Sequence, residues 1–550
     1  MSLLTTLARL EAVRAEHARP LATVRHRHLS ERPLVLVPLT TSGEAGAPLG
    51  ALVGTAEDAP RLLIVAQPRD RDLRWRFLAD LADEVLPYLE SFDTDVEEVE
   101  RTETDPDTGK PVKVLAELCR DAPQVIVPGR AGVQYVRLLG RSMRFRRTAE
   151  QDPDTPHPVP TRVPLLGRWF THIGERAHTP GSGLLTAAGD LLARHWATGR
   201  STLEDQHLGS LLAWIDPAGS GLGRPGESGA RAAERLELDR DEHGVLRHPP
   251  AGPATDPAFD NRLLAPAMAR FDAARALDPA DPAAVTRAEA ELRALIDTQL
   301  RPTWHAVWRA VDLLRTLPEG EHVDDRWTRD RWSHTSHRDR VRAGEPPQPR
   351  HDDAVTAARK LASREREQVR LDAQEALDDP LVMAGRRLAG EAFEGEVTEV
   401  VMEWTDSKRP SPRPLLVLSG EDGPQLAEPG TKVWRSLDGR PQAAEFVGWD
   451  GPQEAGRIVL RLLDKMGRGR EPEPGSVPEK GDRTCWTLFE HDVRSGPRLP
   501  EPEQTPWTHG GPPTIGEPNP PAMAPARAGT AAGAPRPAEA PDPLTAEDVW

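Results

Sequence analysis

The 550-residue sequence contains only two cysteines, Cys119 and Cys485, and they lie far apart in the chain. Two cysteines exclude a framework of several disulfides and a zinc site built from several Cys ligands. The same scarcity is typical of proteins from a reducing compartment. Chemistry in this chain must therefore be sought among other residue types.

Long apolar runs are also missing. No stretch approaches the roughly 18 consecutive apolar residues that a membrane-spanning helix needs. The N-terminal stretch is amphipathic, and Arg9, Glu11 and Arg14 interrupt the apolar run that a signal peptide requires. We therefore expect a soluble, cytoplasmic protein with no membrane partner.

Lysine is scarce as well, since only seven of the 70 basic residues are Lys. This bias, together with abundant Ala and Pro, is typical of GC-rich coding DNA, so a high Arg content is weak evidence for nucleic-acid binding. The net charge of −17 argues against a uniformly basic surface and still permits local basic patches. The 56 Pro and 44 Gly are expected in linkers and loops.

The periodicity of apolar residues changes several times along the chain. Short β-branched runs at 34–37 and 62–66 predict buried strands, and helical spacing over 72–89 predicts a helix. A turn at 105–109 between two further apolar runs predicts a hairpin. This mixture predicts an N-terminal α/β domain.

A different pattern follows the Pro-rich stretch near residue 151. Helical stripes dominate up to about residue 392, and Pro302 is placed to open a second helix within the stripe from Leu292 to Leu314. A charged helix with a thin apolar stripe is expected at 355–377, packed along one edge or contacting a partner. Evenly spaced short strands then predict a small β-barrel.

These patterns together predict a multidomain α+β protein. The last segment has many Pro and few large apolar residues, so it cannot bury enough surface to offset the entropy of ordering. The expected units are an N-terminal amphipathic helix (1–29), the α/β domain (30–148), a linker (149–162), a mostly helical region (163–392) with a flexible connector (216–258), the barrel (393–493) and a disordered tail (494–550).

A first group of arginines lies in the helical stretch 133–147. Arg137, Arg141 and Arg144 share one helical face, and Arg146 and Arg147 follow directly. Guanidinium groups so placed are suited to neutralising phosphates. The alternative interpretation is an ordinary solvated face of an amphipathic helix.

A second group, at 326–342, is the densest aromatic and basic cluster of the chain. Its composition is typical of a loop that binds phosphates or single-stranded nucleic acid. The alternative is a capped helix end with paired surface charges. The candidate residues are Arg326, Trp327, Arg329, Arg331, Trp332, Arg338, Arg340 and Arg342.

No catalytic, metal or cofactor motif is complete. His334 and His337 supply two ligands at most, and zinc needs three or four. The G-x-G-x-x-G string at 221–226 contains Pro225 and lacks the strand-to-helix context of a dinucleotide site. We therefore predict no catalytic residue, no metal and no cofactor.

The predicted barrel carries the one resemblance to a known family. The run 428–434 (Glu-Pro-Gly-Thr-Lys-Val-Trp), the turn 447–451, the strand 457–462 and the aromatic strand 485–489 resemble the small β-barrel of superfamily-one helicases. The resemblance implies a barrel that lies beside a motor core and touches nucleic acid. This chain has no Walker A or Walker B motif, so such a motor would be a separate polypeptide.

The tail ends in a short acidic and aromatic motif. A Pro-rich tether raises the effective concentration of its tip around a partner. The tip is similar in kind to the acidic tips of single-strand DNA-binding proteins, and the alternative is an unselected terminus. The predicted docking residues are Leu544, Glu547, Asp548, Val549 and Trp550.

The sequence thus favours a non-catalytic accessory protein that bridges nucleic acid and a separately encoded helicase, other motor or effector. One alternative is a protein–protein scaffold that binds no nucleic acid. Another is an unrecognised metal-dependent nuclease in the α/β domain at 30–148.

Overall fold

The computed structural model describes residues 3–492, except for residues 45, 105–109, 220, 278–280, 421–422, 452–456 and 468. The tail predicted at 494–550, with the docking motif at its tip, lies outside the described residues. The model confirms the mixed α+β architecture with a C-terminal barrel.

A five-stranded sheet with the order β4-β3-β2-β7-β8 forms the centre of the body. Strand β3 runs antiparallel to both β2 and β4, whereas β7 is parallel to both β2 and β8. The strands are β2 (Leu34–Thr40), β3 (Pro48–Gly54), β4 (Arg61–Ile64), β7 (Val125–Val127) and β8 (Leu185–Ala187).

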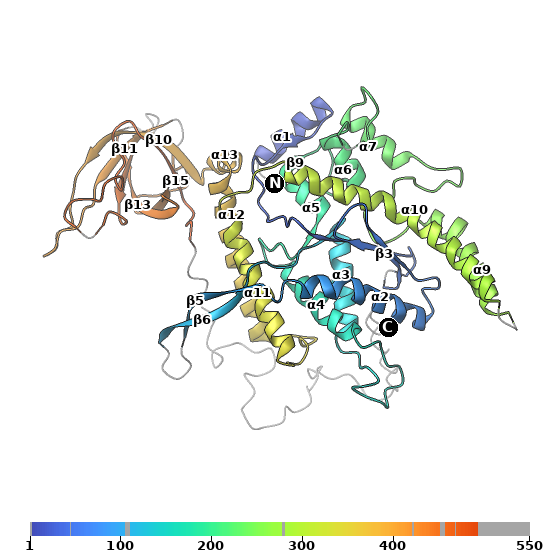
Figure 1. Cartoon of the computed structure of the whole chain (residues 1–550). Helices are drawn as coiled ribbons and strands as arrows, with labels where there is room; N and C mark the ends of the chain where they lie inside the picture. Colours follow the sequence, from blue (N-terminus) through green and yellow to red (C-terminus); the bar gives the residue numbers. More distant parts are fainter. Residues whose placement is uncertain are drawn as a thin grey trace, which may run out of the picture.

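Helices cover both faces of this sheet (Figure 1). Alternate residues of a strand point to opposite faces, so Leu34 and Leu36 join one core while Val35, Val37 and Leu39 join the other. The first core is completed by α2 (Arg71–Glu90), α3 (Arg130–Met143) and α4 (Val163–Arg176), and the second by α5 (Ala188–His195), α6 (Leu208–Ile215) and α10 (Pro282–Arg315).

The sheet extends past the linker predicted at 149–162. Strand β8 follows that segment and pairs with β7, while α4 packs closely against α3. A three-residue strand is too short to show an alternation in the sequence, which is why this part of the chain has only a helical pattern. Residues on both sides of 149–162 therefore build one sheet.

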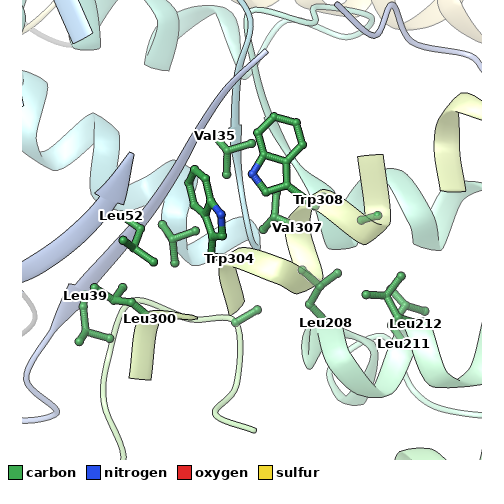
Figure 2. Close-up of a cluster of buried hydrophobic side chains, with 14 of the residues drawn as sticks. Val35, Leu39, Leu52, Leu208, Leu211, Leu212, Leu300, Trp304, Val307 and Trp308 are labelled. Carbon is green, nitrogen blue, oxygen red and sulfur yellow. The ribbon is translucent and has the colours of Figure 1, made fainter. Parts of the chain in front are cut away.

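Helix α10 runs through Pro302 as a single helix, so the sequence-based expectation of two helices is wrong. Pro302 removes one main-chain hydrogen bond. Leu300 and Trp304 on either side are fully buried, and this packing holds the helix together across the proline. Figure 2 shows Trp304 and Trp308 among apolar side chains of the sheet, with the leucines of α6 beside the same helix.

The connector predicted at 216–258 contains a helix, α7 (Gly229–Leu238), which packs on α6. Ser228 caps it by accepting a hydrogen bond from the Arg231 N–H, and small residues such as Ala232 and Ala233 bury its inner face. The smaller elements of the body are α1 (Leu3–Ala15), β1 (Arg19–Pro20), β9 (Trp196–Ala197), a 3₁₀ turn (Glu204–Gln206), α8 (Pro257–Phe259), a π-helical turn (Asp260–Leu264) and α9 (Ala265–Arg275).

The predicted hairpin is confirmed as β5 (Val96–Thr104) and β6 (Pro111–Cys119). Its strands pair with each other and with no other described strand. Figure 1 shows the hairpin extending away from the body beside α11 (Val323–Arg342).

Helices α12 (Ala354–Asp378) and α13 (Pro380–Leu388) lead from the body to the barrel (Figure 1). Asp379, at the junction, accepts hydrogen bonds from the Thr23 N–H and hydroxyl at 2.6 and 2.9 Å. The buried Asp379 carboxylate thereby ties the N-terminal segment to the junction of α12 and α13.

The C-terminal barrel is closed, with the strand order β10-β11-β14-β13-β12-β15. Phe393, Phe446 and Trp486 are buried at its centre. Asp438 and Gly439, with φ of 49° and 71°, form the two-residue turn that joins two strands. The strands are β10 (Ala392–Val401), β11 (Leu415–Ser419), β12 (Lys432–Leu437), β13 (Arg440–Trp449), β14 (Arg457–Leu462) and β15 (Arg483–Thr487).

None of the helices that the structure describes is long and apolar enough to span a bilayer.

Candidate functional site

The second arginine group, for which the sequence left a binding loop and a capped helix end as alternatives, forms helix α11. Arg326 and Arg338 are almost fully buried, with 4% and 1% of their surface exposed. Arg326 donates to Gln374 Oε1 at 2.8 Å and to the carbonyl of His26, and Arg338 donates to the carbonyl of Asp93. These two guanidinium groups therefore bind protein atoms inside the molecule.

Of the two tryptophans of the group, one faces inward and the other contacts the β5–β6 hairpin. Trp327 is 5% exposed, stacks on His28 and donates its Nε1–H to Asp121. Trp332 is half-buried, with the Arg101 guanidinium 5.2 Å from its ring centre. These contacts attach α11 to the rest of the body.

The remaining arginines of α11 differ in exposure. Arg331 is half-buried, donates to the carbonyl of Cys119 and forms an ion pair with Glu97 of the hairpin. Arg340 and Arg342 are exposed near the end of the helix. Arg329 is half-buried and lines a surface hollow.

The first arginine group, on α3, is dispersed. Arg144 is buried and donates to the carbonyls of Gln348 and Pro349, and Arg146 lies over the Trp75 ring. Arg141 and Arg147 are exposed, and Arg147 pairs with Asp152. Arg137 is half-buried, and burial together with the charges of Arg141 and Arg364 lowers its pKa, against the opposing effect of Glu175.

A buried histidine cluster lies between α4 and α11. The rings of His172 and His337 are stacked 4.1 Å apart, and burial lowers the pKa of His337 to about 3. His334 is different: burial opposes protonation, but hydrogen bonds with Asp93 and Cys119 raise its pKa. Within the described part of the chain, no group of three or more His, Cys, Asp or Glu side chains is placed to hold a metal ion.

A hollow of about 290 Å³ opens between the end of α4, α11 and α12. The loop after α4 closes one end, where Gly181 has a φ of +89° and Ser182 follows. Cationic side chains outnumber carboxylates on its wall. The cations are Arg176, Arg326, Arg329, Lys360 and Arg364, and the carboxylates are Glu175 and Glu367.

Two further hollows continue from the first toward the barrel. The second, of about 450 Å³, lies between α11, α12 and the β12–β13 turn, and it shares Arg329 with the first. The third, of about 460 Å³, lies on the barrel and shares Arg440 with the second. We call these three adjoining hollows the basic groove.

Two cationic side chains of the first hollow are held in place by hydrogen bonds to buried side chains of the protein. Arg176 donates to the fully buried Asp330 at 2.6 Å, and Asp330 also accepts from the Ser182 hydroxyl and the Gly183 N–H. Arg326 is held by Gln374 and lies 3.7 Å from Asp378. These two cations shape the wall and have strong internal partners.

Two other cations are held more loosely. Arg329 Nε lies 3.4 Å from Glu367 Oε2, and Arg364 Nη2 lies 3.4 Å from Glu175 Oε2. Charge-assisted hydrogen bonds of good geometry are about 2.7–2.9 Å long, so both pairs are weak. Burial lowers the pKa of Arg329, which means that its charged form is incompletely solvated. An anion that enters the hollow would supply the hydrogen bonds and opposite charge that these two guanidinium groups lack in the described part of the chain.

Sequence reasoning identified Arg326 and Arg329 but missed most of the groove. Lys360, Arg364 and Arg370 belong to the charged helix α12, whose thin apolar stripe was the available signal for a contact face. Arg440 lies just past a hairpin turn, where no local pattern marks it.

No protein-family model, curated protein or solved structure matches this chain. The geometry of the groove is therefore the basis for the function proposed below.

Proposed function

We propose that this protein binds single-stranded nucleic acid along the basic groove, as a non-catalytic accessory to a separately encoded motor or effector. The main observation in support is that Arg329 lines both the first and the second hollow and Arg440 lines both the second and the third. The shared arginines place cations in each hollow from the body to the barrel, in excess of carboxylates in the first two and balanced by Asp438 and Glu473 in the third. A path of three adjoining hollows suits a chain of phosphates better than a single small anion.

The dimensions of the path favour a single strand. Along α12 the path runs from Lys360 to Gln374, which is about 21 Å at 1.5 Å per residue. Hollows of 290–460 Å³ have room for a phosphate with its sugar or base, and a duplex is too wide to enter them. The strand would lie with its phosphates toward Arg329, Arg364 and Lys360.

An exposed aromatic ring lies near the barrel end of the path. Trp404 is 45% exposed, and its Nε1–H donates to the carbonyl of Arg470 at 3.0 Å. Arg470 itself does not line the third hollow, but Gly467 and Glu473, which precede and follow it in the chain, do. Bases of single strands stack on such rings with little sequence preference.

The accessory role rests on two further features. The chain contains no Walker motif, and its barrel resembles the one that superfamily-one helicases carry beside their motor. The tip residues 544–550 would recruit the motor. Deleting them should reduce recovery of a copurifying motor without changing nucleic-acid affinity, and undiminished recovery would refute recruitment by the tip.

Binding can be tested by fluorescence anisotropy with a labelled oligo-dT, its RNA equivalent and a duplex, over a series of salt concentrations. We expect preference for the single strands and affinity that falls steeply with salt. Arg329→Ala should weaken binding about tenfold, as expected for one charge-assisted hydrogen bond, and lower the salt slope by about 0.7.

Arg340→Ala is the matched control, since Arg340 is exposed on the same helix and lines none of the three hollows. It should leave affinity within about twofold. Absence of binding at low salt would refute the proposal and favour a scaffold without nucleic acid. Equal losses in the two variants would show that the groove is not the binding site.

A further inference from the structure

A second kind of hollow lies between the start of α6, the middle of α10 and two loops. Its volume is about 340 Å³, within the roughly 300–1,000 Å³ range of small-molecule pockets. Small residues create the space: Pro302 and Ala306 lie one turn apart on α10, and Gly209 faces them from α6.

The interior of this pocket is mainly apolar. Leu208 and Ala251 are buried, and Leu222, Pro249 and Ala306 complete the apolar wall. Leu208 can be followed in Figure 2, where it lies beside α10. A ligand body that fills this space would be apolar.

Two histidines add polarity without charge. His207 Nε2 lies 3.1 Å from the carbonyl oxygen of His248, and its Nδ1 accepts from the Ser210 N–H, which together assign the neutral tautomer. Burial lowers the pKa of both His207 and His248. The interior therefore carries no formal charge near neutral pH.

The charges are at the rim. Glu57 is engaged, because its Oε1 lies 2.8 Å from His305 Nδ1. Arg309 is exposed one turn further along α10 and forms no ion pair with any carboxylate that the structure describes. At the rim, the Glu57 carboxylate is therefore already bound to His305, and the Arg309 guanidinium is, among the described residues, free to meet a ligand.

We infer that this pocket binds a small molecule with an apolar, aromatic-sized body and one acidic group. The body lies against Ala306 and Leu222, and the acidic group lies at the rim beside Arg309. A cationic ligand would meet Arg309 and would have to compete with His305 for the Glu57 carboxylate. The inference is independent of the basic groove, which shares no residue with this pocket.

Two fluorescent probes test the inference on the full-length chain: 8-anilinonaphthalene-1-sulfonate and its uncharged analogue N-phenyl-1-naphthylamine. We expect saturable binding of the sulfonate at one site. Arg309→Ala should weaken the sulfonate about tenfold and leave the uncharged probe within about twofold, because only the sulfonate meets the guanidinium. Ala306→Phe fills the space and should abolish binding of both probes.

Arg301→Ala is the matched control, since Arg301 lies on α10 and pairs with Asp297 away from the pocket. It should change neither affinity. Absence of saturable binding to the wild-type chain would overturn the inference. Equal loss of affinity for both probes in Arg309→Ala would also overturn it. Because the Arg309 side chain is exposed, we expect this variant to fold, so the test holds even if Ala306→Phe does not fold.

Discussion

Arg329 and Glu367 face each other across the first hollow of the basic groove, with Nε and Oε2 3.4 Å apart. Glu367 also accepts from Arg370 at 3.0 Å, so one carboxylate restrains two cations of the groove. Any phosphate that enters must compete with this carboxylate.

Glu367→Gln should therefore strengthen binding of single-stranded nucleic acid. Removing a partly exposed ion pair releases about 0.4–1 kcal/mol, which corresponds to a two- to fivefold gain in affinity. Anisotropy at one fixed salt concentration measures the change. A weaker or unchanged affinity would contradict the competition. Glu345→Gln, a change of an exposed carboxylate outside the three hollows, is the control.

Asp330 anchors the end of the groove from inside the protein. Its carboxylate accepts from Arg176, the Ser182 hydroxyl and the Gly183 N–H, and it is fully buried. Asp330→Ala leaves these donors unpaired, and we expect a loss of about 3–5 kcal/mol in unfolding free energy. Urea unfolding followed by tryptophan fluorescence measures it. The exposed Asp324→Asn should change stability by no more than about 0.5 kcal/mol, and a similar loss in both variants would contradict the anchoring role.

The barrel could be predicted from local sequence patterns, whereas the burial of helix α11 could not. The barrel was predictable because alternation of apolar residues and an Asp-Gly turn are local signals, and 393–493 encloses nearly all its strands. Helix α11 was interpreted from its composition either as a binding loop or as a capped helix end, because it has almost no apolar stripe that would decide between them. Its burial depends on polar partners such as His26 and Asp93, which lie hundreds of residues away and leave no local signal.

The groove was only partly predictable for the same reason. Arg326 and Arg329 stand in a conspicuous run, but their neighbours in space come from α12 and from a barrel turn. Strand β8 was missed because three residues cannot display a period. Long-range packing, rather than local propensity, decides each of these features.

Close contact between α3 and α4 depends on glycine. A Cβ on Gly140 would lie 2.5 Å from the backbone nitrogen of Thr171, and backbone atoms of a packed helix cannot move away easily. Gly140→Ala should lower the unfolding free energy by about 1–3 kcal/mol, despite the better helix propensity of Ala. Gly385→Ala, where the nearest atom would be a Leu4 side-chain carbon at 3.7 Å, should be neutral or stabilising by up to about 1 kcal/mol. Equal effects of the two changes in urea unfolding would contradict the steric argument.

The stacked pair of His172 and His337 should make the protein sensitive to mild acid. Burial, followed by the charges of Arg340, Arg168 and His334, lowers the pKa of His337 to about 3, below the ordinary value of 6.5. As the pH falls below 6.5, this histidine binds a proton in the unfolded chain but not in the folded chain, so acid favours unfolding.

Each such histidine lowers the unfolding free energy by about 1.4 kcal/mol per pH unit in this window. His337→Gln removes one titrating group, and the slope of unfolding free energy against pH between 6 and 4.5 should become shallower by about that amount. The exposed His243→Gln is the control. A slope that stays the same in His337→Gln, measured by urea unfolding at several pH values, would show that His337 is already protonated in the folded protein.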